Sequence, residues 1–557
     1  MPELIKTCYQ CKESFLIEEA DLAFYQKVSP VFGGKTFLVP PPTRCPLCRE
    51  QSRLVWRNEH KLYSRKCDLT GKEIISVHAS DKDYPVYSGD AWWSDAWDAC
   101  SYGREFNFTK TFFEQFKTLV EQVPRAALYN VQGENSKYNQ STGNLKNCYL
   151  LAGSNYDEDC YYGKYLLSSK NCVDVHMIET CELCYECTDC KNCYNCSFSQ
   201  DCTNCHDSQF LQACYNCSNC FGCVNLSNKQ YCFFNQQYSK EDYQMAVRKF
   251  DLGKHSEVRR ADSLMREHIK KYPVRYMNGT YNDNVSGDHI SQSKNSQYCF
   301  GCSQIENCKY CVFFYQAKDC MDVFAWGMPA ELCYYSMEVG GGAYQVLFSA
   351  TCFSSQRLYY CFQCHNSTDC FGCSGLKKKQ YCIFNKQYAK DEYEKLVPQI
   401  IEHMCSTGEW GEFFPLSFSG FGYNETIAYE QMPSDRVSVR VRGGLWREEV
   451  EVANMPRLIP DSIHEIDTTI LRESLVCESC QKQYRILSQE LAFYKKQSLP
   501  VPRHCFSCRH LTRLKKRNPQ KLWKSNCSQC GDILQTAVNP TSSRPLYCEA
   551  CYQKLVY

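Results

Sequence analysis

The fold is decided by the stretch Cys181-Glu-Leu-Cys184-Tyr-Glu-Cys187-Thr-Asp-Cys190-Lys-Asn-Cys193-Tyr-Asn-Cys196, in which every third residue is cysteine. Cysteine spacings that are multiples of three extend from Cys148 to Cys232, and several of them are twelve residues. A fixed short period is typical of stacked coils. We therefore predict a β-solenoid with twelve residues per coil, whose narrow bore receives every third side chain.

The bore positions suit small side chains, because cysteine behaves there as a small buried hydrophobe. Buried thiols without a cationic neighbour stay protonated and inert. Metal or thiol storage in the bore is the alternative, and the coil with Cys184, Cys187, Cys190 and Cys193 is its best candidate. The inward third residue resembles the twelve-residue solenoid of insect antifreeze proteins. That resemblance covers architecture alone, because their Thr-x-Thr rows are absent.

One corner of each coil is marked by asparagine or aspartate, which tolerate corner conformations and hydrogen-bond along a ladder. These residues are Asn147, Asp159, Asn171, Asn195, Asp207 and Asn219. A second, degenerate solenoid follows: the segment that begins at Cys220 matches the one that begins at Cys370, with 15 identities in 24 positions. Its period slips by one residue at Cys333 and again before Cys352, and we expect an insertion at Gly340-Gly-Gly.

The two ends of the chain are copies of one module, as Leu22-Ala-Phe-Tyr and Leu491-Ala-Phe-Tyr illustrate. C-x-x-C pairs place two thiolates at one point, and two pairs complete a tetrahedral Zn²⁺ site. We predict three structural zinc sites: Cys8, Cys11, Cys45 and Cys48; Cys477, Cys480, Cys505 and Cys508; Cys527, Cys530, Cys548 and Cys551. We expect the four C-x-x-C pairs of the C-terminal module to combine in sequence order, which makes two compact knuckles, with interleaved pairing as the alternative. Zinc is expected to supply folding energy to this module.

The N-terminal module keeps one ligand of its second site. Cys67 aligns with Cys527, whereas Thr70, Ser88 and Ala91 stand where the other three ligands should be. We predict that this site holds no metal. Apolar packing of Trp92, Trp93 and Trp97 is expected to replace it.

The pattern of C-x-x-C, Phe-Tyr, Pro and Arg-Cys-x-x-Cys-Arg resembles the probable zinc-ribbon domain common in bacterial genomes. The whole layout resembles uncharacterised Cys-rich bacterial proteins, for which no activity is implied. Trp92-Trp-Ser-Asp-Ala-Trp-Asp and Gly408-Glu-Trp-Gly-Glu-Phe-Phe-Pro fit that resemblance.

The fold class expected is mainly β, with two short-period Cys-rich β-solenoid blocks, helical insertions and zinc-ribbon-like modules at both ends. The predicted domains are residues 1–98, an N-terminal zinc-ribbon module; 99–146, a helical connector; 147–238, the first solenoid; 239–280, a helical linker; 281–388, the second solenoid; 389–470, a helix and β linker; and 471–557, a double zinc-ribbon module. Within them, residues 109–122 have helical periodicity, and the alternating stretch 437–442 predicts a strand.

Composition limits the class of protein. The chain has 557 residues, a net charge of +1 and 43 cysteines, but neither a run long enough to span a membrane nor an apolar leader after MPELIKTC. We expect a cytoplasmic protein with reduced thiols and no membrane contact. An extracellular, disulfide-bonded protein is the alternative.

Charge is polarised locally. Residues 503–524 carry eight Lys or Arg and no acid, whereas residues 148–231 are net −6. Basic zinc ribbons are a common footprint of nucleic-acid binding. We therefore predict contacts to RNA or DNA, in a ribosome or polymerase context, from Arg49, Arg53, Arg57, Arg509, Arg513, Lys515, Lys516 and Arg517, with Trp523 stacking on a base. The basic modules could instead dock on the chain's own acidic solenoid.

The solenoids would then act as a rigid scaffold. Two alternatives are a protein-interaction scaffold without nucleic acid, with outer Tyr149, Tyr161, Tyr185, Phe221 and Phe233 meeting a protein, and metal or thiol storage. We expect no enzymatic activity, because neither a paired carboxylate on a groove nor a nucleophile motif is evident. The oligomeric state is left open.

Overall fold

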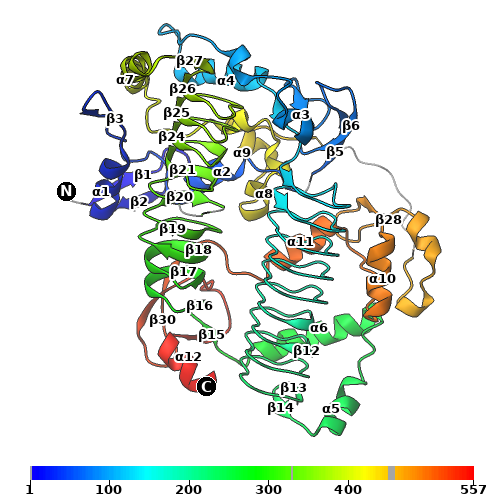
Figure 1. Cartoon of the computed structure of the whole chain (residues 1–557). Helices are drawn as coiled ribbons and strands as arrows, with labels where there is room; N and C mark the ends of the chain where they lie inside the picture. Colours follow the sequence, from blue (N-terminus) through cyan, green and yellow to red (C-terminus); the bar gives the residue numbers. More distant parts are fainter. Residues whose placement is uncertain (1–2, 60, 326, 328–329, 449–457, 557) are drawn as a thin grey trace. The chain divides into compact units, whose positions relative to one another are not determined.

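A computed structural model describes residues 3–59, 61–325, 327, 330–448 and 458–556 (Figure 1). The chain forms two compact units, each of them discontinuous in sequence. Unit 1 comprises Met1–Ala127, Met277–Arg447 and Gln520–Leu522; unit 2 comprises Leu128–Tyr276, Glu448–Pro519 and Trp523–Tyr557. Each unit therefore joins one solenoid to the module from the opposite end of the chain.

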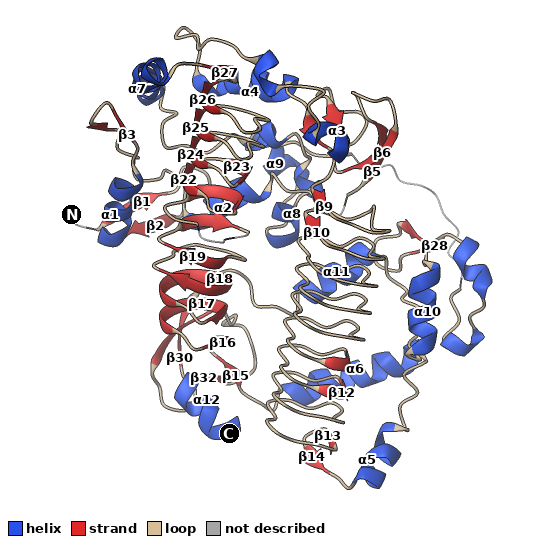
Figure 2. Cartoon of the chain, in the orientation of Figure 1, coloured by secondary structure: helices blue, strands red, loops and turns tan. Residues whose placement is uncertain are grey.

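The first solenoid lies in unit 2 and confirms the period of twelve. Residue i forms a parallel bridge with residue i+12 throughout, as in Tyr149 with Tyr161 and Tyr161 with Val173. Most coils are drawn as loops because these bridges are isolated (Figure 2). The short strands are β9 Asn130–Val131, β10 Thr142–Gly143, β11 Tyr194–Ser197, β12 His206–Gln209, β13 Cys232–Phe233 and β14 Gln236–Gln237. The ladder begins at β9, inside the predicted connector, because Asn139 and Thr142 fill the bore there in place of cysteine.

Each coil consists of four triplets: an inward residue, a bridging residue and a corner residue with positive φ. The predicted corners Asn147 and Asp159 both have φ of 52°. Corner ladders also form, with Asn195 Nδ2 donating to Asp207 Oδ1 at 2.7 Å. The other corners use the same left-handed conformation even for Leu150 and Tyr156. Backbone hydrogen bonds to neighbouring coils therefore outweigh the strain, on the order of 1–2 kcal/mol per residue, of that conformation.

The bore is lined by thiols that bond to the backbone. Cys187 Sγ lies 3.5 Å from the carbonyl oxygen of Tyr185 and 3.3 Å from that of Cys196, and this pattern recurs along the bore. Carbonyl oxygens around a sulfur stabilise the protonated thiol, because they would repel a thiolate. In the part of the chain that the structure describes, no three bore thiols bring their sulfurs within 4.8 Å of one another. This geometry favours an inert bore over metal storage.

The second solenoid, in unit 1, has longer strands. They are β16 Gly279–Thr280, β17 Asp283–Ser291, β18 Lys294–Glu306, β19 Tyr315–Lys318, β20 Met321–Phe324, β21 Tyr334–Gly340, β22 Tyr344–Leu347, β23 Ala350–Phe353, β24 Gln356–Tyr359, β25 Thr368–Phe371, β26 Gln380–Ile383 and β27 Lys386–Gln387. Both predicted slips are thirteen-residue steps, since Met321 pairs with Tyr334 and Gly340 with Phe353. The register returns to twelve at Tyr344, so the second extra residue lies at Gly340-Gly-Gly as predicted.

Helices close the solenoid ends and cover their sides. α4 (Phe112–Gln122), α5 (Lys240–Val247), α6 (His255–Ile269) and α7 (Lys390–Ser406) confirm the predicted helices. The predicted strand at 437–442 is wrong: Arg436–Val441 forms α9, because Asp435 caps it by accepting from Ser438 N. Other short elements are α8 Ile427–Gln431, β15 Val274–Arg275, η2 Leu416–Ser419, η3 Tyr423–Glu425, η4 Ile463–Glu465 and η5 Thr468–Arg472.

The two end modules share one order of elements, and the N-terminal module adds a hairpin between its first two helices and further elements at its end. The N-terminal module contains β1 Leu4–Thr7, β2 Ser14–Ile17, α1 Glu19–Val28, β3 Val31–Phe32, β4 Lys35–Thr36, α2 Pro46–Leu54, β5 Tyr63–Lys66, β6 Glu73–Ser76, β7 Val86–Tyr87, α3 Gly89–Trp93, η1 Ala99–Tyr102 and β8 Arg125–Ala126. The C-terminal module contains β28 Leu475–Val476, β29 Gln483–Tyr484, α10 Ser488–Lys496, α11 Phe506–Leu514, β30 Trp523–Asn526, β31 Ile533–Thr536, β32 Leu546–Tyr547 and α12 Glu549–Val556. Among the described residues, no helix is both long and apolar enough to cross a membrane.

Candidate metal centres and docking interfaces

All three predicted cysteine tetrads are assembled. In each, the first C-x-x-C lies in the turn of a β-hairpin and the second lies at the start of a helix. Cys45 and Cys505 are the residues immediately before α2 and α11, and Cys548 immediately precedes α12. Each site is thus a knuckle facing a helix N-terminus, and the C-terminal pairs combine in sequence order, as expected. A helix N-terminus favours a thiolate through its positive dipole end.

The sulfur positions fit Zn²⁺. The distances are 3.7 Å from Cys11 to Cys45, 3.6 Å from Cys480 to Cys505 and 3.7 Å from Cys530 to Cys548. A tetrahedron with Zn–S bonds of about 2.3 Å has edges of about 3.8 Å. The twelve cysteines would therefore hold three structural zinc ions, and the metal would supply folding energy to modules with small cores.

Backbone donors prepare the first cysteine of each C-terminal tetrad, Cys477 and Cys527. Burial alone would raise the pKa of Cys477, but surrounding backbone N–H groups lower it to about 6. The same balance lowers the pKa of Cys527 to about 6, and Cys548 N donates to Cys527 Sγ at 3.3 Å. These thiols are thus largely ionised at neutral pH, as zinc binding requires.

The fourth site, around Cys67 in the N-terminal module, has the same fold as the other three but lacks three of the four cysteine ligands. β5 and β6 form the hairpin, and Ser88 N donates to Cys67 Sγ at 3.3 Å, as Cys548 N does to Cys527. The side chain of Thr70 also bonds to Cys67 and lowers the pKa of that thiol against the effect of burial. One hydroxyl and a backbone N–H thus take the place of the missing thiolates around this sulfur, and the donor set does not fit zinc.

Tryptophan packing surrounds this fourth site, as predicted. Trp92 is fully buried, with its ring 5.6 Å from that of Trp97 and 5.4 Å from that of His365 on the second solenoid. Lys377 Nζ donates to the carbonyl oxygens of Trp92 and Ser94 at 2.9 and 2.7 Å. The half-module is therefore held against its solenoid by apolar and polar contacts.

The arginines predicted to contact nucleic acid are buried instead. Arg49, Arg53, Arg57, Arg509 and Arg513 expose at most 5% of their surface. They lie on or just after α2 and α11, and those helices lie against the solenoids of their own units (Figure 1). The prediction that these five residues bind phosphate is wrong, because their charges are paired with solenoid carboxylates.

In unit 1 the partners are Asp322 and Glu338. Arg49 Nη2 and Arg53 Nη1 lie 2.8 and 3.2 Å from the carboxylate of Asp322, whose side chain is fully buried. Arg57 pairs with Glu338 and with its neighbour Glu59.

In unit 2 the same plan recurs. Arg509 Nε lies 2.7 Å and Arg513 Nη1 3.0 Å from Asp174, and Arg517 Nε lies 2.7 Å from Asp189. The Arg517 side chain is 8% exposed, so it too is removed from a phosphate-binding role.

Aromatic contacts complete both interfaces. The Arg49 guanidinium lies 5.3 Å from the Tyr310 ring, and that of Arg509 lies 5.1 Å from the Tyr162 ring. Each tyrosine precedes its aspartate by one coil of twelve residues. The sequence contained a signal for these interfaces in the spacing of four between the arginines, which places them on one helix face.

The remaining predicted nucleic-acid residues differ from these. Lys515 and Lys516 are exposed, and Trp523 is half-buried on β30. Of the predicted phosphate contacts, the structure therefore leaves Lys515 and Lys516 exposed, rather than a continuous cluster of arginines.

The outer aromatic rows are also used internally. Tyr161 and Tyr185 belong to an apolar cluster with Tyr494 and Leu499 of the C-terminal module. Phe221 packs with Phe250 of the segment between α5 and α6. Aromatic residues expected to meet a partner thus hold unit 2 together.

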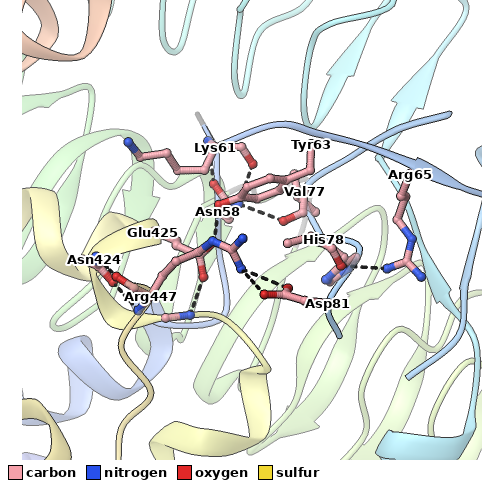
Figure 3. Close-up of polar contacts among 12 residues, drawn as sticks. Asn58, Lys61, Tyr63, Arg65, Val77, His78, Asp81, Asn424, Glu425 and Arg447 are labelled. Atoms are coloured by element: carbon pink, nitrogen blue, oxygen red, sulfur yellow. Dashed lines mark hydrogen bonds and ion pairs between the residues drawn. The ribbon is translucent and has the colours of Figure 1, made fainter. Parts of the chain in front are cut away.

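A polar network in unit 1 joins the hairpin β5–β6 to the segment after α9 (Figure 3). Arg447 Nη1 lies 3.0 Å from both carboxylate oxygens of Asp81, and its guanidinium lies 4.9 Å from the Tyr63 ring. Tyr63 Oη donates to Glu425. Beside it is a cavity of about 420 Å³ lined by Asp81, Tyr84 and Arg125, among others. The Asp81 carboxylate is paired with Arg447, so we interpret the network as a structural contact that holds these two segments together.

Comparison with known proteins identifies one of the modules. Residues 520–555 match the family described as "Probable treble clef zinc finger", in agreement with the knuckle and helix around Cys527, Cys530, Cys548 and Cys551. No curated protein sequence matches the chain.

Among solved structures, the chain is similar to one described as a "putative acetyltransferase from Desulfovibrio desulfuricans G20", at 7% identity and a TM-score of 0.11. The match covers 39% of this chain and 63% of that one, and it supports no inference about this chain.

Proposed function

We propose that the chain is a non-enzymatic, zinc-stabilised scaffold that binds a protein partner through the uncovered faces of its first solenoid. The observation that carries this proposal is the internal use of the arginines. The arginines on and just after α2 and α11 form ion pairs with Asp322, Glu338, Asp174 and Asp189. We therefore infer that the basic modules stabilise the solenoids.

The free faces of the first solenoid have the character of a protein-binding surface. Two columns of bridging residues, one from Asn155 to Ser227 and one from Glu158 to Gln230, run along it at intervals of twelve. They expose Leu167, Tyr194 and Tyr215, each with more than 40% of its surface accessible. Tyrosine is enriched at protein interfaces because it supplies contact area at low entropic cost.

Charges on these columns alternate in sign. Lys170 Nζ lies 2.8 Å from Glu158, and Lys191 Nζ lies 3.2 Å from Glu179. Such a surface does not attract a polyanion, since each cation has a neighbouring carboxylate.

Two binding experiments separate protein from nucleic acid. In low salt, fluorescence anisotropy with single-stranded RNA and duplex DNA should show weak binding. Lys515→Glu/Lys516→Glu should abolish this binding. Arg49→Ala should leave the affinity of the folded fraction unchanged. Affinity purification should yield a stoichiometric protein that survives nuclease treatment. Tight, salt-sensitive RNA or DNA binding would overturn the proposal in favour of the nucleic-acid alternative.

The surface itself is tested by Tyr194→Ser/Tyr215→Ser. The matched control is Tyr281→Ser on the second solenoid, where Tyr281 is 88% exposed. The protein partner should be lost from the first variant and retained by the control. Retention by both would exclude these columns as the binding surface.

A further inference from the structure

The two docking interfaces share one plan, but one solenoid position carries a charge in one interface and none in the other. That position immediately precedes the tyrosine whose ring lies against Arg49 in unit 1 and against Arg509 in unit 2. It is Lys309 in unit 1 and Tyr161 in unit 2. The facing module positions also differ. Glu18 and Asp21 of the N-terminal module correspond to Leu487 and Glu490 of the C-terminal module.

In unit 1 this position holds a buried cation between two carboxylates. Lys309 Nζ lies 2.8 Å from Glu18 Oε2 and 2.7 Å from Asp21 Oδ1, and its side chain is 10% exposed. Asp21 itself is 2% exposed. Glu18 is the N-cap of α1, so the beginning of that helix is fixed on Lys309.

In unit 2 the position is apolar. Tyr161 is 6% exposed and belongs to the cluster against which Leu487 packs. Leu487 is the N-cap of α10, in the same place as Glu18. Glu490 is engaged by other groups, with Tyr162 Oη donating to it at 2.9 Å and Tyr494 Oη at 2.7 Å.

Exchanging the modules would leave the buried Asp21 carboxylate without its cation and the Lys309 ammonium with one carboxylate fewer. On a solenoid with tyrosine at this position, Glu18 and Asp21 would lose their cation. On a solenoid with lysine there, the ammonium would face Leu487 in place of Glu18, and its remaining carboxylate, Glu490, is already held by Tyr494 of its own module. Breaking a buried pair in this way is costly, and unpaired charges are an effective way to reject a wrong partner.

We propose that Lys309 and Tyr161, with the module residues that face them, determine which module docks on which solenoid. This inference does not rest on the proposed function. It concerns docking of the N-terminal module on the wrong solenoid during synthesis, because this module and the first solenoid are made before the second solenoid. N-terminal segments fold first during translation. The missing cation at Tyr161 therefore keeps the N-terminal module free until Lys309 has been made.

The test uses the full zinc-loaded chain and a lysine-reactive cross-linker. Lys27 Nζ lies 2.8 Å from Asp319 Oδ2, so a link between Lys27 and the adjacent Lys318 reports docking of the N-terminal module on the second solenoid. Lys309→Tyr should reduce this link more than about tenfold. The matched control, Lys294→Tyr at an exposed solenoid position, should retain it.

Restoring the Lys27–Lys318 link by compensating substitutions tests the proposal even if Lys309→Tyr folds poorly. Adding Glu18→Leu and Asp21→Glu to Lys309→Tyr recreates the unit 2 contact and should restore the Lys27–Lys318 link. Glu18→Leu/Asp21→Leu with Lys309 retained leaves the ammonium without a carboxylate and should lose the link. An unchanged link in Lys309→Tyr, or a triple variant no better than Lys309→Tyr, would overturn the proposal.

Discussion

Arg509 and Asp174 form a buried ion pair, with Arg509 Nε 2.7 Å from Asp174 Oδ2 and both side chains at most 4% exposed. Asp174 also receives Arg513 at 3.0 Å, so one carboxylate balances two guanidinium groups. The pair attaches α11 to the first solenoid, and Arg49 with Asp322 does the same for α2 on the second. A helix that resembles a nucleic-acid-binding element thus acts as a docking element.

Replacing Asp174 by asparagine should loosen the C-terminal module. Two arginines would remain buried with one carboxylate fewer, and such losses cost about 3–5 kcal/mol. We expect a lower melting temperature and faster hydrogen exchange along α11. Asp159→Asn, at a half-exposed corner of the same solenoid, is the control, and equal effects of both substitutions would contradict the docking role.

Zinc should be bound at three sites per chain. Cys548→Ser should lower the metal content from three zinc ions to two, whereas Cys67→Ser should leave it unchanged, because Thr70 and Ser88 provide hydroxyls rather than thiolates at the fourth site. Elemental mass spectrometry on purified protein measures both. A zinc ion lost with Cys67→Ser would show that the fourth site binds metal.

Asp157 should make the first solenoid less stable as pH rises. It points into the bore and is 1% exposed, and burial raises its pKa to about 9. The unfolded chain releases this proton near its ordinary pKa of about 4, so the contribution is complete below about pH 4 and is lost as pH rises toward 9. Asp157→Asn should therefore raise the melting temperature at pH 8 and have little effect at pH 4. An equal gain at both values would refute this assignment.

His176 should make unit 2 sensitive to acid. Its ring lies 5.6 Å from that of His510, and burial together with nearby Arg517 holds its pKa well below the usual 6.5. Stability is therefore present above about pH 6.5 and lost as pH falls, because the unfolded chain gains the proton first. His176→Phe should reduce this dependence in thermal melts between pH 5 and 7.5, and Phe324 stands at the equivalent position of unit 1. His255 and His268, whose pKa values are also lowered by burial, account for the remaining acid response of unit 2. An unchanged acid response would show that another group is responsible.

The bore thiols should resist alkylation in the folded, zinc-loaded chain. Cys187 and its neighbours are fully buried and bond to backbone carbonyls, whereas Cys405 is exposed. Iodoacetamide labelling followed by peptide mass spectrometry should modify Cys405 first and the bore only after unfolding. Rapid native labelling of Cys187 would contradict an inert bore.

The sequence by itself determined the parts that depend on local spacing. The cysteine period placed the coils that carry cysteine, the glycine run located the second register shift, and the C-x-x-C pairs identified the ligands, because each of these depends on residues close along the chain or in a strict repeat. The corner conformation was predicted at one position in four, since asparagine and aspartate signal it and leucine or tyrosine does not.

Only the tertiary structure decided how the basic helices are used. Arg49 lies 273 residues from Asp322, and Arg509 lies 335 residues from Asp174, so no local pattern links them. The same sequence of arginines would bind phosphate if exposed; burial against solenoid carboxylates assigns it to docking instead. Charge in a sequence specifies what a side chain can attract, whereas the fold specifies which opposite charge it reaches.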